Sequence, residues 1–231
     1  VESAVNELAD KLGMDPCKLR LKNLVKTGET LWQLGEEPLR SCRADECLKR
    51  AMQLVGWSRR PIREDLGDKV RALGVALTMQ GSGISNCDIA NVEITLEDDG
   101  FYVLKHGATD VGTGGDTILA QIAAEVLGCD VDRIVVRGVD TDTSPFDTGA
   151  YASSGTYTTG GATVKAARDL VKKMRKQAAK WWDLPVDAIE FDAGTIRTTD
   201  GKKSMTVAEM ANQGIGFGLQ PGMLSGHGRN T

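Results

Sequence analysis

Apolar residues in the first 57 positions recur at the spacing of amphipathic helices. Leu8 and Leu12 lie on one predicted apolar face, which ends at Gly13, a residue type that commonly terminates a helix. A second helix is expected after Asp15, which can cap it, and a third over residues 43–55. The pattern therefore predicts a helical segment at the start of the chain.

From residue 69 onward the pattern changes to that of strands. Residues 90–97 alternate apolar and polar side chains, and residues 101–106 return after a turn at 98–100, which is typical of a β-hairpin. Residues 222–231 are expected to form neither helix nor strand. The other expected elements are strands at 71–80, 131–139, 188–192 and 195–198, a helix ending at 128, a long helix at about 161–182 and a short helix after 204–206.

This order indicates an α+β fold, with a helical N-terminal segment followed by a mixed sheet with packed helices. The charged, proline-containing stretch 59–68 is the best candidate for a boundary, so we expect two parts, 1–60 and 61–231. The chain begins with Val1 rather than Met, and we expect it to be a piece of a longer protein, continuing from an upstream domain.

Two segments rich in glycine and hydroxyl side chains, 110–117 and 147–161, each lead into a predicted helix. The free N–H groups at a helix start attract anions such as phosphate, and glycine lets the backbone approach a ligand closely. The first segment could instead be a simple turn capped by Thr113 or Asp116. The small residues at 152–155 are harder to explain without a ligand, so together the segments suggest a polyanionic cofactor held mainly by backbone.

Composition narrows the classes of partner. The net charge of −4 argues against nucleic acid, since the densest basic stretch, 172–176, is expected to be a solvated helix face. No apolar run approaches the length of about 20 residues that a membrane span needs, and no signal-peptide pattern is present, so we expect no membrane partner and a cytoplasmic location. The five cysteines are scattered and are expected to be reduced and mostly buried.

Few side chains suggest metal or acid–base chemistry. With two histidines in the chain, a histidine metal site or a Ser-His-Asp triad has little to draw on. His106 is expected to be a partly buried strand residue, and Glu125 a solvated helix residue rather than a general base. The aromatic pair Trp181 and Trp182 is expected to pack the end of the long helix rather than to form a ligand box. The residues themselves therefore predict neither catalytic nor metal-ligating side chains.

Four segments carry a resemblance to a known family. Residues 2–24 resemble its helical stretch ES-x-x-(D/N)-E-x-A … LG-x-DP-x-x-LR-x-KN-L, and residues 90–103 its A-x-V-x-(I/L)-x-x-DG-x-V hairpin. Residues 110–125 and 140–161 resemble its two cofactor loops. The chain thus resembles part of the molybdopterin-binding large subunit of the xanthine dehydrogenase/aldehyde oxidase family of molybdenum hydroxylases.

The resemblance implies a cofactor and the residues that hold it. In the family, a pyranopterin dithiolene carries molybdenum, in bacteria often as molybdopterin cytosine dinucleotide, and the metal ligands do not come from Cys or His side chains. Many relatives have Gln where this chain has Thr113, whose shorter hydroxyl can still donate to phosphate but does not reach as far. The residues that would contact the cofactor by position are Gly112, Thr113, Gly114, Ala152, Ser153, Ser154, Gly155 and Thr156.

The resemblance also implies partners and missing parts. The intact enzyme would hydroxylate aromatic heterocycles or aldehydes with water-derived oxygen and pass electrons to FAD and iron–sulfur clusters on partner subunits or domains. The family's GG-x-FG loop and its glutamate-bearing GVGE loop are not in this sequence, so 61–231 would be a cofactor-binding domain incomplete at its C-terminus, inactive alone. Two alternatives remain open: a non-catalytic binding or assembly module on the same scaffold, and one chain of a split large subunit.

Overall fold

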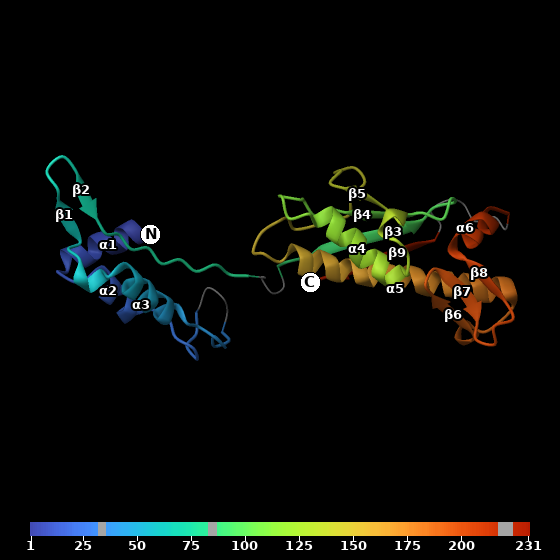
Figure 1. Cartoon of the computed structure of the whole chain (residues 1–231). Helices are drawn as coiled ribbons and strands as arrows, with labels where there is room; N and C mark the ends of the chain where they lie inside the picture. Colours follow the sequence, from blue (N-terminus) through green and yellow to red (C-terminus); the bar gives the residue numbers. More distant parts are fainter. Residues whose placement is uncertain (32–35, 83–86, 217–223) are drawn as a thin grey trace. The chain divides into compact units, whose positions relative to one another are not determined.

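The computed structural model describes residues 1–31, 36–82, 87–216 and 224–231 of the chain. It forms two compact units, Val1–Met79 and Gln80–Thr231 (Figure 1). The predicted division into 1–60 and 61–231 concerns the domains of an intact protein and stays a prediction. In the described ranges no helix combines the length and the apolar character needed to cross a bilayer.

The first unit is mainly helical, as predicted. The buried side chains of Cys17, Leu48 and Trp57 form its small core. Its elements are α1 (Glu2–Lys11), α2 (Pro16–Asn23), α3 (Ala44–Val55), the 3-10 turn η2 (Trp57–Arg59) and an antiparallel pair, β1 (Arg63–Asp65) and β2 (Val70–Ala72).

The strand predicted over 71–80 is wrong beyond Ala72, where the chain has no regular secondary structure. Its apolar residues Leu73 and Val75 pack against the small core instead. The backbone of this segment forms a hydrogen bond with a side chain of α1, since the Asn6 side-chain amide donates to the Val75 carbonyl oxygen at 3.3 Å. An apolar run can therefore be used for packing without strand pairing.

Arg20 ties α1 to α2 from a buried position, with 5% of its surface exposed. Its Nη2 lies 2.8 Å from Glu2 Oε2, and its Nη1 donates to Asn6 Oδ1 at 2.8 Å. Glu2 Oε2 also accepts the Leu77 N–H at 2.6 Å. This N–H, together with the Arg20 guanidinium, lowers the pKa of the Glu2 carboxyl. Polar residues of the stretch 2–24 thus join α1, α2 and the backbone at Leu77.

The second unit is built on a four-stranded sheet of order β5-β4-β3-β9. The predicted hairpin is confirmed, with β3 (Ala90–Leu96) antiparallel to β4 (Tyr102–His106). The expected strand at 131–139 is the shorter β5 (Ile134–Gly138), parallel to β4 and preceded by the 3-10 turn η3 (Val131–Arg133). The mixed sheet of the predicted α+β fold is present.

Helices α4 (Gly115–Leu127) and α5 (Gly155–Trp182) lie on one face of this sheet and begin at the same end of the unit (Figure 1). The side chains between sheet and helices form the main core, in which alanines of both helices allow close packing. Glu125 of α4 is exposed, as expected. Trp181 and Trp182 pack against this core at the end of α5, as expected.

The prediction that residues 222–231 lack regular structure is wrong for residues 225–230, because β9 (Ser225–Asn230) pairs with β3. Residues 222 and 223 lie outside the described residues. Its residues that face α5 include Gly226 and Gly228, both buried. A Cβ at either glycine would overlap a backbone oxygen of α5. This strand is buried through its backbone rather than through apolar side chains, so the hydrophobic pattern does not reveal it.

A small three-stranded sheet follows α5. The strands predicted at 188–192 and 195–198 and the helix after 206 are confirmed. Arg175 joins α5 to this sheet by donating to the Ile189 carbonyl at 2.7 Å, so the basic stretch 172–176 is not simply a solvated face. The elements are the 3-10 turn η4 (Val186–Ala188), β6 (Ile189–Asp192), β7 (Thr195–Thr198), β8 (Ser204–Thr206) and α6 (Val207–Gly216).

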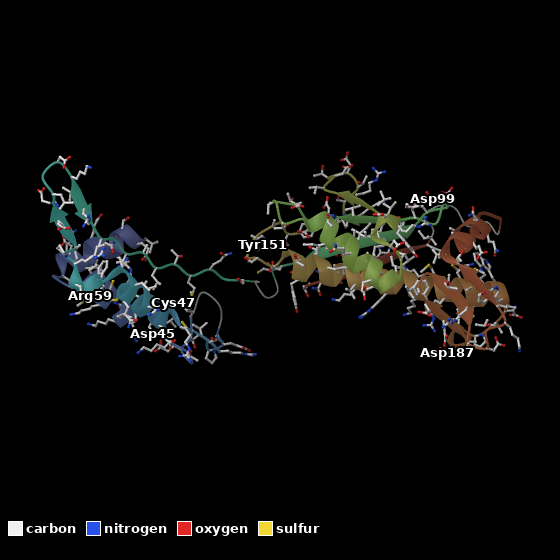
Figure 2. The ribbon with its side chains drawn as sticks, in the orientation of Figure 1. Asp45, Cys47, Arg59, Asp99, Tyr151 and Asp187 are labelled. Carbon is white, nitrogen blue, oxygen red and sulfur yellow. The ribbon has the colours of Figure 1, made fainter. Side chains whose placement is uncertain are left out.

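All five cysteines are free thiols. The expectation that they are mostly buried is wrong, since only Cys17 is buried. Cys47 and Cys87 are exposed, and Cys47 lies on α3 (Figure 2). Cysteine packs well in a core, but in this chain most of the thiols lie at or near the surface.

Candidate functional site

A cavity of about 480 Å³ lies where α4 and α5 begin, and both glycine-rich segments line it. Figure 2 marks this end of the second unit with Tyr151, one of the lining residues. The other lining residues are Gln80, His106, Ala108, Thr109, Asp110, Val111, Thr113, Gly115, Ile118, Leu119, Asp147, Gly149, Ala150, Ala152, Ser153, Gly155, Thr156 and Thr159.

The first loop turns tightly around the side chain of Asp110. Its Oδ1 accepts the backbone N–H groups of Gly112 and Thr113 at 2.8 Å each and that of Gly114 at 3.2 Å. These hydrogen bonds, the one from Gly112 first, lower the pKa of the Asp110 carboxyl. Gly112 and Gly114 have left-handed φ angles of 96° and 72°, which glycine adopts without strain. The loop is therefore held by one carboxylate.

The second loop is shorter than predicted, because α5 begins at Gly155 rather than at about Gly161. Small and hydroxyl-bearing residues have weak preferences, so the pattern placed the first turns of this helix in the loop. Ala152 and Ser153 just before the helix have φ angles of 51° and 55°. Left-handed backbone at two consecutive non-glycine residues is strained, and such strain is concentrated at functional sites.

Asp147 joins the second loop to the start of α5. Its Oδ1 accepts the Gly149 N–H at 2.8 Å, and its Oδ2 accepts the Thr159 hydroxyl at 3.4 Å. Gly107, just after β4, leaves no room for a side chain here, since a Cβ would come within 2.5 Å of the Pro145 carbonyl oxygen. The close backbone approach at Gly107 thus positions the wall of the cavity.

The eight residues predicted to contact a cofactor fall into two groups. Lining the cavity are Thr113, Ala152, Ser153, Gly155 and Thr156. The other three, Gly112, Gly114 and Ser154, are not lining residues: the glycines donate to Asp110, and the buried Ser154 is the N-cap residue of α5.

His106 is a cavity residue that the sequence analysis did not select. It was expected to be partly buried, but its side chain is fully buried beside Gly138 and Asp116. Its Nε2 lies 3.2 Å from Asp116 Oδ1, within ion-pair distance, yet the angles are not those of a hydrogen bond. Neither ring nitrogen has a hydrogen-bond partner among the described residues. Its position at the end of the alternating strand, directly before Gly107, was the available signal.

The cavity is lined by hydroxyl groups and apolar side chains, together with two carboxylates. No Lys or Arg is among the lining residues, while Asp110 and Asp147 are. Hydroxyl groups of Thr113, Ser153 and Thr156 lie beside apolar side chains such as Ile118. In the described part of the chain, no three His, Cys, Asp or Glu side chains are grouped to hold a metal ion. Such a lining offers hydroxyl groups and apolar contact to a small molecule.

Comparison with known proteins identifies relatives over most of the chain. Residues 50–229 match the family described as "Molybdopterin cofactor-binding domain". The chain is 35% identical over 230 residues to "Probable hypoxanthine oxidase XdhD" of Escherichia coli K12, which covers 94% of this chain and 24% of that protein. It is 30% identical over 238 residues to "Carbon monoxide dehydrogenase large chain" of Afipia carboxidovorans, covering 91% and 29%.

Solved structures show the same fold. CO dehydrogenase from Oligotropha carboxidovorans matches with a TM-score of 0.56 and 26% identity, covering 99% of this chain and 31% of that one. Quinoline 2-oxidoreductase from Pseudomonas putida 86 matches with a TM-score of 0.55 at 19% identity, a likeness of fold alone. The chain spans a quarter to a third of the length of these proteins.

Proposed function

The chain belongs to the family of molybdopterin cofactor-binding domains, and on that premise we propose that the cavity at the starts of α4 and α5 holds part of the molybdenum cofactor in an oxidoreductase. The observation that carries the proposal is the convergence of both glycine- and hydroxyl-rich segments on this one cavity. Each segment supplies several of the lining residues.

The cavity fits such a group in size and chemistry. Its volume lies in the range of small-molecule sites, about 300–1,000 Å³. The strained backbone at Ala152 and Ser153 brings small side chains, and with them the backbone, to the cavity wall. The first turn of α5 contains no acidic residue, so its free N–H groups can donate hydrogen bonds to a phosphate there.

Within the proposal, each wall has its own task. Thr156 donates its hydroxyl hydrogen bond to a polar group of the cofactor, and Gly155 donates its N–H at the start of α5. Thr113 offers its hydroxyl oxygen as an acceptor, because its hydroxyl hydrogen is directed at Asp110. Ala152, Ser153 and Ser154 shape the wall of the second loop, and Gly112 and Gly114 shape the turn of the first loop. Ile118 offers apolar contact to a flat ring. When bound, the cofactor supplies a metal centre for oxygen and electron transfer; the residues of this chain bind and orient it.

We further propose the reaction and partners of the intact protein. It would hydroxylate an aromatic heterocycle, an aldehyde or a related small molecule with water-derived oxygen, in the cytoplasm. Electrons would pass to FAD and iron–sulfur clusters on partner subunits or domains, the rest of the large subunit would supply the catalytic base, and the cofactor would be the cytosine dinucleotide form. The relatives named as hypoxanthine oxidase and carbon monoxide dehydrogenase support an oxidoreductase but differ in substrate.

Molybdenum and pterin analysis of the purified intact protein tests the proposal. We expect about one molybdenum and one pterin per copy of this domain, with loss of both when Gly155→Val closes the start of α5. The matched control is Gly74→Val, because Gly74, like Gly155, has no positive φ and nothing within 4 Å of a Cβ. An active protein without molybdenum would refute the proposal. An intact protein with neither metal nor activity would instead favour the non-catalytic assembly module, whereas a glutamate-bearing loop on a separate chain would favour the split subunit.

A further inference from the structure

The first loop already contains an anion, the carboxylate of Asp110. Three consecutive backbone N–H groups, of Gly112, Thr113 and Gly114, are directed at one of its oxygens, and the Thr113 hydroxyl lies 3.3 Å from the same oxygen. Successive N–H groups that converge in this way form the concave anion site that proteins use for phosphate. In this chain the site is filled by a side chain located two residues before it.

Other aspartates of the chain accept fewer backbone N–H groups on one oxygen. Asp15, the N-cap residue of α2, accepts two, from Cys17 at 2.8 Å and Lys18 at 2.9 Å. Asp99 accepts one backbone N–H, from Phe101 at 2.9 Å, and Asp140 accepts one from Asp142 at 2.9 Å. The three N–H bonds at Asp110 exceed what an ordinary aspartate turn needs. The lowered pKa of the Asp110 carboxyl agrees with this geometry, because each N–H favours its ionised form.

The charge around the loop also opposes an external anion. The carboxylate of Asp110 is ionised at neutral pH, and Asp116 adds a second carboxylate in the first turn of α4. A phosphate approaching the three N–H groups would meet negative charge and donors that are already used. The glycine-rich sequence, which by itself predicts a phosphate site, therefore has a different role at this loop.

We propose that Asp110 is a positioning residue, which folds the first loop before a ligand arrives and excludes external anions from the N–H groups of residues 112–114. It acts through Thr113, whose side chain it holds at the cavity wall. This last step rests on the proposed function, because it assigns Thr113 to the bound cofactor. The anionic group of that cofactor is then held by donors other than these three amides.

The direct test is an anion titration of the full 231-residue chain labelled with 15N at glycine and threonine. In Asp110→Ala we expect the amide resonances of Gly112, Thr113 and Gly114 to shift as inorganic phosphate is added, because three converging N–H groups become free. In the unchanged chain, and in the matched control Asp99→Ala, these resonances should not respond. Asp99 lies at the opposite end of the second unit from Tyr151 (Figure 2). A response in the unchanged chain, or none in Asp110→Ala, overturns the proposal.

A second measurement serves if Asp110→Ala does not fold. In the unchanged chain, hydrogen-exchange protection of the three amides should fall as the pH drops through the pKa of Asp110, which lies below the ordinary 3.8. Asp110→Asn, which keeps an acceptor oxygen, should retain most of the protection at neutral pH. Protection that is unchanged by acid overturns the proposal.

The link to the cofactor is tested in the intact protein. We expect the pterin content of Asp110→Ala to fall about tenfold and that of Asp110→Asn to fall less, while Asp99→Ala stays at the level of the unchanged protein. Equal pterin content in all three overturns the positioning role. Absence of pterin from the unchanged protein would refute the proposed function, and the phosphate titration would still decide whether Asp110 excludes anions.

Discussion

Gly228 of β9 lies directly against the backbone of Ala162 in α5, so close that a Cβ on the glycine would overlap the Ala162 carbonyl oxygen and come within 2.5 Å of the Ala166 nitrogen. Gly226 makes the same kind of contact one turn further along the helix. The contact joins the last strand of the sheet to the helix whose start forms the second wall of the cavity. Glycine here is a requirement of packing.

Gly228→Ala should therefore destabilise the second unit. Because the neighbouring atoms are backbone and cannot move aside cheaply, we expect a loss of about 3 kcal/mol in the free energy of unfolding, at the upper end of overpacking effects. Chemical denaturation measures it. Gly74→Ala is the control, since nothing lies within 4 Å of a Cβ there, and its effect should stay within about 0.5 kcal/mol. Equal stability of both variants would contradict the contact.

The strand that contains Gly228 could not be predicted from the sequence, unlike most of the other elements. The helices of the first unit and the β3–β4 hairpin could be predicted, because their apolar side chains repeat with a helical or strand period. The last strand, β9, has no apolar side chain and is buried through its backbone, so it shows no hydrophobic periodicity in the sequence. The start of α5 at Gly155 was missed for a related reason, since glycine and hydroxyl residues favour loop and helix start alike.

The candidate site was predictable in part. The two segments that line the cavity were found from glycine, hydroxyl groups and their position before helices. The role of Asp110 was not found, although an aspartate two residues before a glycine is a recognisable turn signal. The burial of His106 depends on Gly138, which is distant in sequence and leaves space for the ring. Contacts between neighbouring strands of this kind do not follow from local patterns.

Ala152 provides a test of strain at the second loop. Its left-handed backbone costs about 1–2 kcal/mol for a non-glycine residue, whereas glycine adds about 0.5–1 kcal/mol of unfolded-state entropy. Ala152→Gly should therefore raise the free energy of unfolding by about 0.5–1 kcal/mol. Ala150→Gly, at a neighbouring position without a positive φ, should lower it by a similar amount. Thermal denaturation of the two variants gives the sign, and a loss of stability in both would show that no strain is stored.

His106 provides a test of polar burial under the cavity. A buried polar group without a partner costs about 1–3 kcal/mol, and an apolar replacement of similar shape removes that cost. His106→Leu should therefore leave the free energy of unfolding unchanged or raise it by about 1 kcal/mol. Tyr102→Phe is the matched comparison, because the Tyr102 hydroxyl is also buried without a partner in the described residues, and it should behave likewise. A loss of more than 2 kcal/mol in His106→Leu alone would show that the contact with Asp116 is a stabilising ion pair.

The ion pair of Glu2 and Arg20 predicts how the first unit responds to acid. The Leu77 N–H and the Arg20 guanidinium place the folded-state pKa of Glu2 below its ordinary 4.5. The ionised form is thus favoured by folding, and its contribution is complete above about pH 4.5 and lost as the pH falls through the folded-state pKa. We expect hydrogen exchange of residues 1–24 to show local unfolding as the pH is lowered below 4.5, and Glu2→Gln should remove this pH dependence. Glu7→Gln, at an exposed position of the same helix, should keep this pH dependence.

Arg20→Met leaves the Glu2 carboxylate without its buried partner and should lower the free energy of unfolding by about 3 kcal/mol at pH 7. An Arg20→Met variant as stable as the unchanged chain would contradict this account.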